Sequence, residues 1–137
     1  MTGRILAIDY GTKRSGIAVT DPLQIIANPL TTVPTAELLQ FLSTYFEKEK
    51  VVRVVIGEPI PDPGAVSKVE THIRGFLKKF GEKFPGMPVE REDERFTTQM
   101  AHQSLMEGGA KKKTRQNKEL VDAISAAIIL QSYMGHR

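Results

Sequence analysis

Apolar positions along the chain alternate between strand-like and helix-like spacing, which predicts an α/β protein. Two short apolar runs, Ile5 to Ile8 and Gly16 to Val19, flank a polar turn that contains Gly11. Runs of this kind on either side of a glycine-containing turn predict a β-hairpin. Ile25 to Val33 predicts a third strand, and Asn28-Pro29 within it indicates an edge position or a bulge.

A helix and a buried strand are predicted next. Apolar side chains recur at helical spacing from Leu38 to Phe46, after Pro34-Thr35, and Thr35 is expected to cap this helix. Val51 to Ile56 is β-branched and almost wholly apolar, as in a central strand covered on both faces. A strand, a helix and a second buried strand in this order imply a right-handed crossover between two parallel strands.

The second half of the chain predicts three more helices and one strand. Helical stripes of apolar residues cover about Ala65 to Phe80, which Gly81 and Pro85-Gly86 should end, and Gln99 to Glu107. Between them, Met87 to Arg95 is expected to return to the sheet as a strand, although its sequence is largely charged. Glu119 to Tyr133 carries a broad apolar face and predicts the final helix.

Composition narrows the class of protein. With 137 residues, 40% of them hydrophobic, the chain has the size and the apolar content of one domain, residues 1–137, with a core of its own. The absence of cysteine excludes disulfides, zinc fingers and cysteine nucleophiles. No apolar run has the length of a membrane span and no signal-peptide pattern is present, so we expect a cytoplasmic location. A net charge of +3 is compatible with a nucleic-acid partner without requiring one.

Acidic residues at the ends of three predicted elements form a candidate metal site. Asp9 ends the first strand, Asp93 or Glu94 ends the last strand, and Asp122 lies in the first turn of the final helix. Mg²⁺ and Mn²⁺ prefer carboxylate oxygens, and two such ions can promote phosphodiester cleavage. Each acid also has a structural explanation: a turn cap for Asp9, a solvated charge for Glu94 and a helix-dipole partner for Asp122. The coincidence of the three favours the metal site.

Basic residues near these acids are candidates for binding phosphates. Lys13 and Arg14 follow Asp9 in the predicted turn. The densest positive cluster of the chain precedes the final helix and consists of Lys111, Lys112, Lys113, Arg115 and Lys118. Such a cluster can be a solvated loop, but here it would place cations beside the predicted metal site. Aromatic residues are scarce in it, which favours recognition of backbone and shape.

The sequence does not contain the patterns of other common catalytic or metal sites. The three histidines lack metal-ligand spacing to one another, and we expect them at the surface: His72, His102 and His136. No Ser-His-Asp order and no P-loop pattern are present. The remaining candidate chemistry therefore rests on carboxylates and cations.

Four segments together resemble the YqgF family, also called RuvX, in order and across the whole chain. They are Ile8 to Ala18, Val55 to Pro59, Asp93 to Thr98 and Val121 to Ala127. The resemblance implies an RNase H-like fold, with a five-stranded mixed sheet flanked by helices. It also implies a nuclease that uses Mg²⁺ or Mn²⁺, expected as two ions, and that matures the 5′ end of pre-16S ribosomal RNA or resolves four-way DNA junctions.

The resemblance assigns roles to individual residues. Asp9, Glu94 and Asp122 would be the catalytic acids and metal ligands, while Asp93 receives no role. The nucleic-acid backbone would be held by Lys13, Arg14, Arg95 and the Lys111 to Lys118 cluster. Two features depart from the family pattern: Glu58 stands where an apolar residue is common, and the segment before Asp93 is unusually charged.

Three alternatives remain open at this point. A Holliday junction resolvase should be a symmetric dimer, whereas an enzyme that processes structured RNA can be a monomer or a homodimer. A nucleic-acid binding module without catalysis would bind equally well without metal. Phosphoryl transfer from ATP is a weaker alternative, because Asp9 to Thr12 also resembles the first phosphate loop of the actin and sugar-kinase superfamily. Proteins of that superfamily build their site from two such domains, and this chain has length for one.

Overall fold

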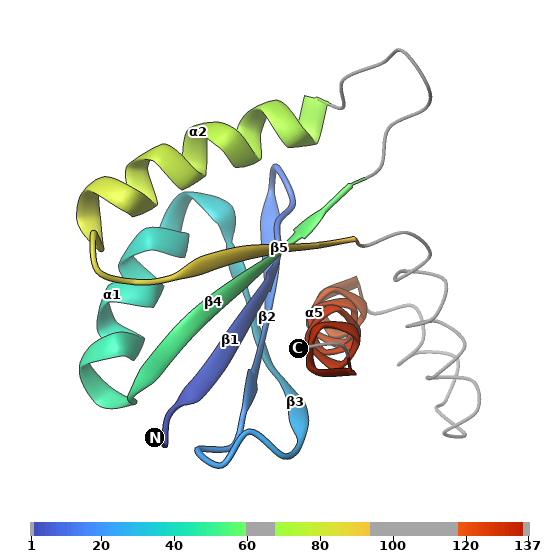
Figure 1. The fold of residues 1–137 in the computed structure, drawn as a ribbon. Helices are drawn as coiled ribbons and strands as arrows, with labels where there is room; N and C mark the ends of the chain where they lie inside the picture. Colours follow the sequence, from blue (N-terminus) through green and yellow to red (C-terminus); the bar gives the residue numbers. More distant parts are fainter. Residues whose placement is uncertain (1, 60–67, 94–117, 136–137) are drawn as a thin grey trace.

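The computed structural model describes residues 2–59, 68–93 and 118–135, and a five-stranded mixed sheet lies at its centre (Figure 1). The strands are β1 (Arg4–Asp9), β2 (Arg14–Thr20), β3 (Ala27–Pro34), β4 (Val51–Glu58) and β5 (Val89–Asp93). Their order in the sheet is β3-β2-β1-β4-β5. β1, β4 and β5 are parallel to one another, and β2 is antiparallel to both of its neighbours. The predicted mixed sheet is therefore confirmed.

Helices cover both faces of this sheet. They are η1 (Thr35–Glu37), α1 (Leu38–Lys48), α2 (Lys68–Lys83) and α5 (Lys118–Gly135). Figure 1 shows α1 and α2 on one face and α5 on the other. One core cluster joins Leu6 and Ile8 of β1 to apolar residues of α1 and α2, and a second joins Ile5 and Ala7 to α5. Strand β1 is thus buried on both sides, as its uninterrupted apolar sequence requires.

The third strand has the edge position that its prolines indicate. β3 pairs only with β2 in the described sheet, and the register shifts between Ile17 and Ala18, whose partners are Thr31 and Pro29. The shift leaves Leu30 as an extra residue on β3, which is the geometry of a β-bulge. The predicted edge strand with a bulge near Asn28-Pro29 is confirmed.

One predicted helix cap was wrong, and one predicted helix end is shifted. Thr35 does not cap a helix: neither η1 nor α1 has a side-chain cap, and the Thr35 hydroxyl donates to the carbonyl of Gly11 instead. α2 continues through Gly81 to Lys83 and ends before Pro85-Gly86, because the packing of Phe80 and the adjoining Phe84 in the core cluster under α1 and α2 outweighs the weak helix propensity of one glycine. Residues 60–67 and the predicted helix from 99 to 107 lie outside the described residues.

The parallel strands bring their carboxyl ends to one edge of the sheet. Ile8 of β1 pairs with Ile56 of β4, and Glu58 of β4 pairs with Asp93 of β5. In open α/β sheets this edge is where ligands bind. No helix in the described ranges is both long and apolar enough to cross a membrane.

Candidate active site

Asp9 is the last residue of β1, at the carboxyl edge of the parallel strands. Ile5 and Ala7 belong to the core cluster under α5, whereas Leu6 and Ile8 belong to the cluster under α1 and α2. Because side chains alternate between the two faces of a strand, Asp9 shares the face of α5. A carboxylate thus ends a fully buried strand on the side that α5 covers.

Gly16 brings the beginning of α5 onto this edge. It pairs with Asp9 across the β1–β2 ladder. A Cβ atom at Gly16 would overlap the carbonyl group of Asp122, so the helix backbone touches the strand where the glycine has no side chain. This close approach places Asp122 beside the strand position of Asp9. Two of the three predicted acids therefore converge from opposite ends of the chain.

Asp122 forms an ion pair with Arg14, the first residue of β2. The Nε atom of Arg14 donates to Oδ2 of Asp122 over 2.6 Å. Both side chains are partly exposed, Arg14 by 38% and Asp122 by 28%. The guanidinium group compensates the charge of the carboxylate and fixes its direction. Arg14 therefore pairs with one of the predicted acids, and its predicted contact with a nucleic-acid backbone stays a prediction.

The turn between β1 and β2 is held rigidly against η1. The hydroxyl of Thr35 donates to the carbonyl of Gly11 over 2.6 Å, and its backbone N–H donates to the carbonyl of Lys13 over 3.0 Å. The hydroxyl of Ser15, which is fully buried, lies 2.8 Å from that of Thr35. A Cβ atom at Gly11 would overlap the carbonyl oxygen of Arg14, so the turn is tight enough to require glycine.

Glu58 and Asp93 belong to the opposite face of the sheet. Arg91 donates to both carboxylate oxygens of Glu70 on α2, over 3.1 and 2.7 Å, and lies 3.9 Å from Glu58. Asp93 is two residues beyond Arg91 in β5 and shares its face. The hydrogen bonds from Arg91 outweigh burial and hold the pKa of Glu70 below its ordinary value. Neither Glu58 nor Asp93 shares the face of Asp9.

Glu92 is a buried carboxylate that the sequence does not single out. It is only 6% exposed and accepts a hydrogen bond of 2.6 Å from the hydroxyl of Ser132 on α5. The charged run from Val89 to Asp93 suggests solvated side chains, but strand alternation directs Glu92 under α5. That alternation, applied to the predicted strand, is the signal that identifies it. Glu92 and Asp9 therefore lie on the same face of the sheet.

The described residues include two of the three acids predicted to bind metal, Asp9 and Asp122. Glu94 lies outside them, and within 2–59, 68–93 and 118–135 no three or more acids or histidines are grouped as metal ligands. Mg²⁺ commonly takes one or two carboxylates from a protein and completes its shell with water and substrate oxygens. Asp9 and Asp122 fit that donor set in chemistry and in position. The metal site with Glu94 as its third acid stays a prediction.

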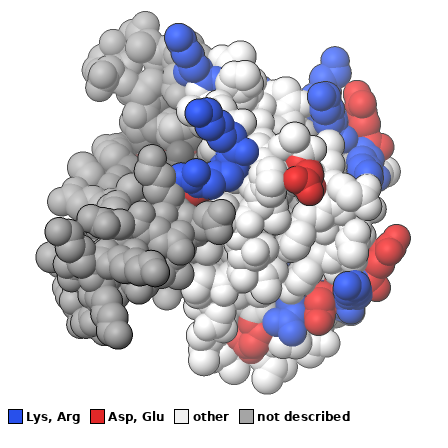
Figure 2. Space-filling model, turned by 180° about the vertical axis from the view of Figure 1, so that it is seen from behind, with Lys and Arg blue, Asp and Glu red and all other residues white. Residues whose placement is uncertain are grey.

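The predicted phosphate-binding cations are only partly described. Lys13 is exposed in the β1–β2 turn, and Arg14 is paired with Asp122. Figure 2 shows Lys and Arg side chains in several separate groups around the margin of one face of the molecule, some of them beside acidic side chains, with few charges between the groups. The other predicted cations lie outside the described residues or have side chains outside them: Arg95, Lys111, Lys112, Lys113, Arg115 and Lys118.

Comparison with known sequences identifies close relatives. The model of the RuvX family, described as Holliday junction resolvase, matches residues 3–136. A protein of Christiangramia forsetii named "Putative pre-16S rRNA nuclease" is 60% identical over 131 residues, which cover 96% of this chain and 97% of the relative. A protein of Phocaeicola vulgatus with the same name is 57% identical, with 96% and 94% covered.

Solved structures share the fold. RuvC of Thermus thermophilus in complex with a Holliday junction substrate superposes with a TM-score of 0.60 at 18% identity, and covers 98% of this chain and 97% of its own. A second T. thermophilus RuvC structure gives a TM-score of 0.55 at 17% identity, with 96% of each chain covered. At these identities the likeness establishes the RNase H-like fold, which confirms the predicted fold class.

Proposed function

Because the chain belongs to the RuvX family, we propose that it is a metal-dependent nuclease that cuts structured RNA at the 5′ end of pre-16S ribosomal RNA. The names of relatives at 60% and 57% identity support this substrate. The observation that carries the chemistry is the contact between Gly16 and the backbone of Asp122, because it places Asp122 beside Asp9 at the carboxyl edge of the sheet.

Asp9 and Asp122 are the proposed ligands of Mg²⁺ or Mn²⁺, expected as two ions. When bound, such ions activate a water molecule and stabilise charge on the leaving oxygen. Glu94, which lies outside the described residues, is the expected third acid because the resemblance to the family assigns it that role. Arg14 directs the Asp122 carboxylate, and the exposed Lys13 is placed to contact a substrate phosphate.

Cleavage of four-way DNA junctions is the second candidate. It is supported by the description of the family model and by the fold shared with a RuvC bound to a Holliday junction. A resolvase has to cut two strands symmetrically, so this candidate requires a two-fold symmetric dimer. The RNA-processing enzyme can act as a monomer or a homodimer.

The deciding experiment compares two labelled substrates, a precursor 16S 5′ leader and a four-way DNA junction, with Mn²⁺ and with chelator. The Asp9→Asn variant is the control, because it keeps the volume of the side chain and removes one carboxylate oxygen. Metal-dependent cutting of the RNA alone supports rRNA processing, and paired symmetric cuts in the junction support the resolvase. If Asp9→Asn cuts either substrate as fast as the wild type, the proposed metal site is wrong.

A further inference from the structure

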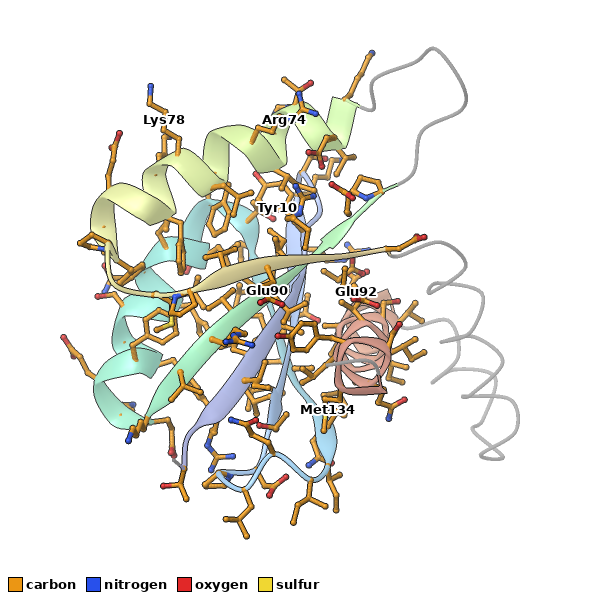
Figure 3. The ribbon with its side chains drawn as sticks, viewed as in Figure 1. Tyr10, Arg74, Lys78, Glu90, Glu92 and Met134 are labelled. Atoms are coloured by element: carbon orange, nitrogen blue, oxygen red, sulfur yellow. The ribbon has the colours of Figure 1, made fainter. Side chains whose placement is uncertain are left out.

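A pocket of about 460 Å³ lies between α2 and the start of α1. Its inner wall contains Tyr10, the residue that follows Asp9. Tyr10 packs against the core cluster under α1 and α2, so the pocket opens on the face of the sheet opposite to Asp9. Figure 3 shows Tyr10 on the sheet side of α2, and Lys78 on the outer side of the same helix.

One stripe of α2 forms a wall of this pocket. His72, Gly75, Phe76 and Lys79 all line it, and their spacing of three and four residues places them on one face of the helix. Gly75 lies at the middle of the stripe, where a Cβ atom would have no neighbour within 4 Å. His72 and Lys79 lie about one turn to either side of it. The pocket is therefore open at its centre and carries a basic residue toward each end.

The floor of the pocket is aromatic and apolar. The rings of Tyr10 and Phe76 are in contact, with centroids 5.5 Å apart and planes inclined by 45°, and Leu39 of α1 adds an aliphatic surface. Thr12 of the β1–β2 turn and Thr35 of η1 also line the pocket. Aromatic surface beside a lysine and a histidine suits a ligand with a flat ring system and an anionic group.

The pocket is continuous with the acidic edge through two consecutive residues. Asp9 and Tyr10 point to opposite faces at the end of β1, and the turn that follows is fixed by the hydrogen bonds of Thr35 to Gly11 and Lys13. A strand of nucleic acid that crosses this turn from the acids would reach the pocket. Lys13 lies on that route and is exposed.

We propose that this pocket binds one unpaired nucleotide, with its base against Tyr10 and Leu39 and its phosphate between His72 and Lys79. The inference rests on the proposed function only for the source of that nucleotide, which would be the substrate strand next to the cleavage site. The volume of the pocket lies within the range of about 300 to 1,000 Å³ that small-ligand sites occupy. A free mononucleotide has the same chemistry, so the test needs one arm for each source.

The test introduces a large side chain into the wall of the pocket. The control introduces the same side chain on the same helix, away from the pocket. Gly75→Phe places a ring in the pocket, whereas Gly81→Phe places the same ring on α2 away from it; a Cβ atom at either position has open space. The probes are a single-stranded oligoribonucleotide carrying 2-aminopurine at successive positions and 2-aminopurine ribonucleoside 5′-monophosphate. Binding and base stacking are measured in chelator from the 2-aminopurine fluorescence, which the chain, having no tryptophan, does not obscure.

We expect the wild type and Gly81→Phe to bind the oligonucleotide alike and to quench 2-aminopurine at one position. Gly75→Phe should bind about tenfold more weakly or worse and lose the quenching, since stacking of one base on an aromatic residue has an effect of this size. Binding of the monophosphate would identify a free nucleotide as a source, and binding of the oligonucleotide alone would identify the strand. If Gly75→Phe and Gly81→Phe bind and quench alike, or if the wild type does not quench 2-aminopurine, the proposed nucleotide pocket is wrong.

A second pair of variants tests whether Lys79 contacts the phosphate of the bound nucleotide. Lys79→Gln should weaken binding, whereas Lys78→Gln, one residue away on the outer side of α2, should not. Equal affinities of the two would overturn the assignment of Lys79. Cleavage of the precursor RNA is measured in parallel. If the wild type stacks the probe but does not cut the RNA, only the proposed function is contradicted. If the wild type cuts the RNA and Gly75→Phe still stacks the probe, only the proposed nucleotide pocket is contradicted.

Discussion

The ion pair between Arg14 and Asp122 joins the first residue of β2 to the start of α5. Its two side chains are partly exposed, and pairs of that kind contribute about 1 kcal/mol or less to stability. The pair between Arg4 and Glu49, at 3.3 Å and with similar exposure, lies away from the acidic edge. Both pairs are partly exposed and differ in position, so the Arg4–Glu49 pair serves as a control for the Arg14–Asp122 pair.

Asp122→Asn should therefore abolish cleavage with little change in stability. The substitution removes a proposed metal ligand, and loss of several kcal/mol of transition-state stabilisation corresponds to a rate reduced by about a hundredfold or more. Glu49→Gln, the control, breaks a comparable ion pair and should cut like the wild type. Single-turnover cleavage and urea unfolding of both variants check this. Equal rates for Asp122→Asn and Glu49→Gln would contradict the role of Asp122.

Gly16→Ala should destabilise the protein, because its Cβ atom would overlap the carbonyl group of Asp122. Overpacking of this kind costs about 1 to 3 kcal/mol, and here it also moves α5 away from Asp9. Gly75→Ala is the control, since its Cβ atom meets open space in a helix, where alanine is favoured by about 0.5 to 1 kcal/mol. Urea midpoints should shift in opposite directions. An unchanged midpoint for Gly16→Ala would show that the helix does not touch the strand at this position.

Among the elements, α2 and β5 are joined by a charged contact in addition to the core cluster against which Val89 packs. Glu70 is buried on α2 and accepts hydrogen bonds from Arg91 of β5 and from Arg74 one turn along the helix. Arg91 also donates to the carbonyl of Gly57 in β4. This network holds α2 to both parallel strands at the carboxyl edge. The position of the nucleotide pocket wall consequently depends on it.

The free energy of unfolding should fall on acidification through the titration of Glu70. Its pKa is lowered in the folded protein by Arg91 and Arg74, so the stabilisation is complete above the unfolded pKa, near 4.5, and is lost as the pH falls through the folded value. Glu70→Gln should reduce stability at pH 7 by roughly 1.5 to 3 kcal/mol, and the difference should shrink below about pH 4. Urea unfolding across this range measures it. Glu82→Gln, at an exposed position of the same helix, should follow the wild type; a constant difference for Glu70→Gln at every pH would contradict the linkage.

The elements with regular patterns of apolar residues could be predicted from the sequence. The charged strand β5 could be predicted only in part. The hairpin of β1 and β2 and the buried strand β4 follow from apolar runs that only a sheet can bury on both faces. In β5, the buried Glu92 and the paired Arg91 look like solvated charges, because their partners Ser132 and Glu70 are distant in sequence. Tertiary partners of this kind leave no local pattern.

At the scale of the whole molecule, the site depends on how the two ends of the chain meet. Sequence indicates the acids, since Asp9 and Asp122 each end or begin an element. It does not indicate that Gly16 lets α5 approach, that Glu58 faces α2, or that Tyr10 lies in a pocket, because each fact depends on which face of the sheet a residue occupies. The contributions of Glu94, Arg95 and the basic cluster stay predictions.

Nucleic-acid binding should depend steeply on salt, with the basic cluster as a main cause. Replacing Lys111, Lys112 and Lys113 together by alanine should weaken binding and reduce the slope of log K against log salt by about 2 to 3, since each phosphate contact contributes about 0.7 to 0.9. The control replaces the exposed Lys48, Lys50 and Lys83, which lie at the end of α1, before β4 and at the end of α2. Fluorescence anisotropy in chelator at several salt concentrations measures the slopes. The same slope for both triple variants would show that the basic cluster does not contact the nucleic acid.

The pairing of Arg14 with Asp122 spans 108 positions of the sequence, and it has a consequence for the time at which activity arises. A chain that is still being synthesised can already contain Asp9, the hairpin and the rest of the sheet while it lacks α5, which is made only when residues 118–135 are added. The acidic pair exists only after that helix has been made and has settled over Gly16. If the enzyme cuts ribosomal RNA as proposed, the nascent chain is therefore inert toward the ribosome that makes it until α5 has been made and has packed on the sheet.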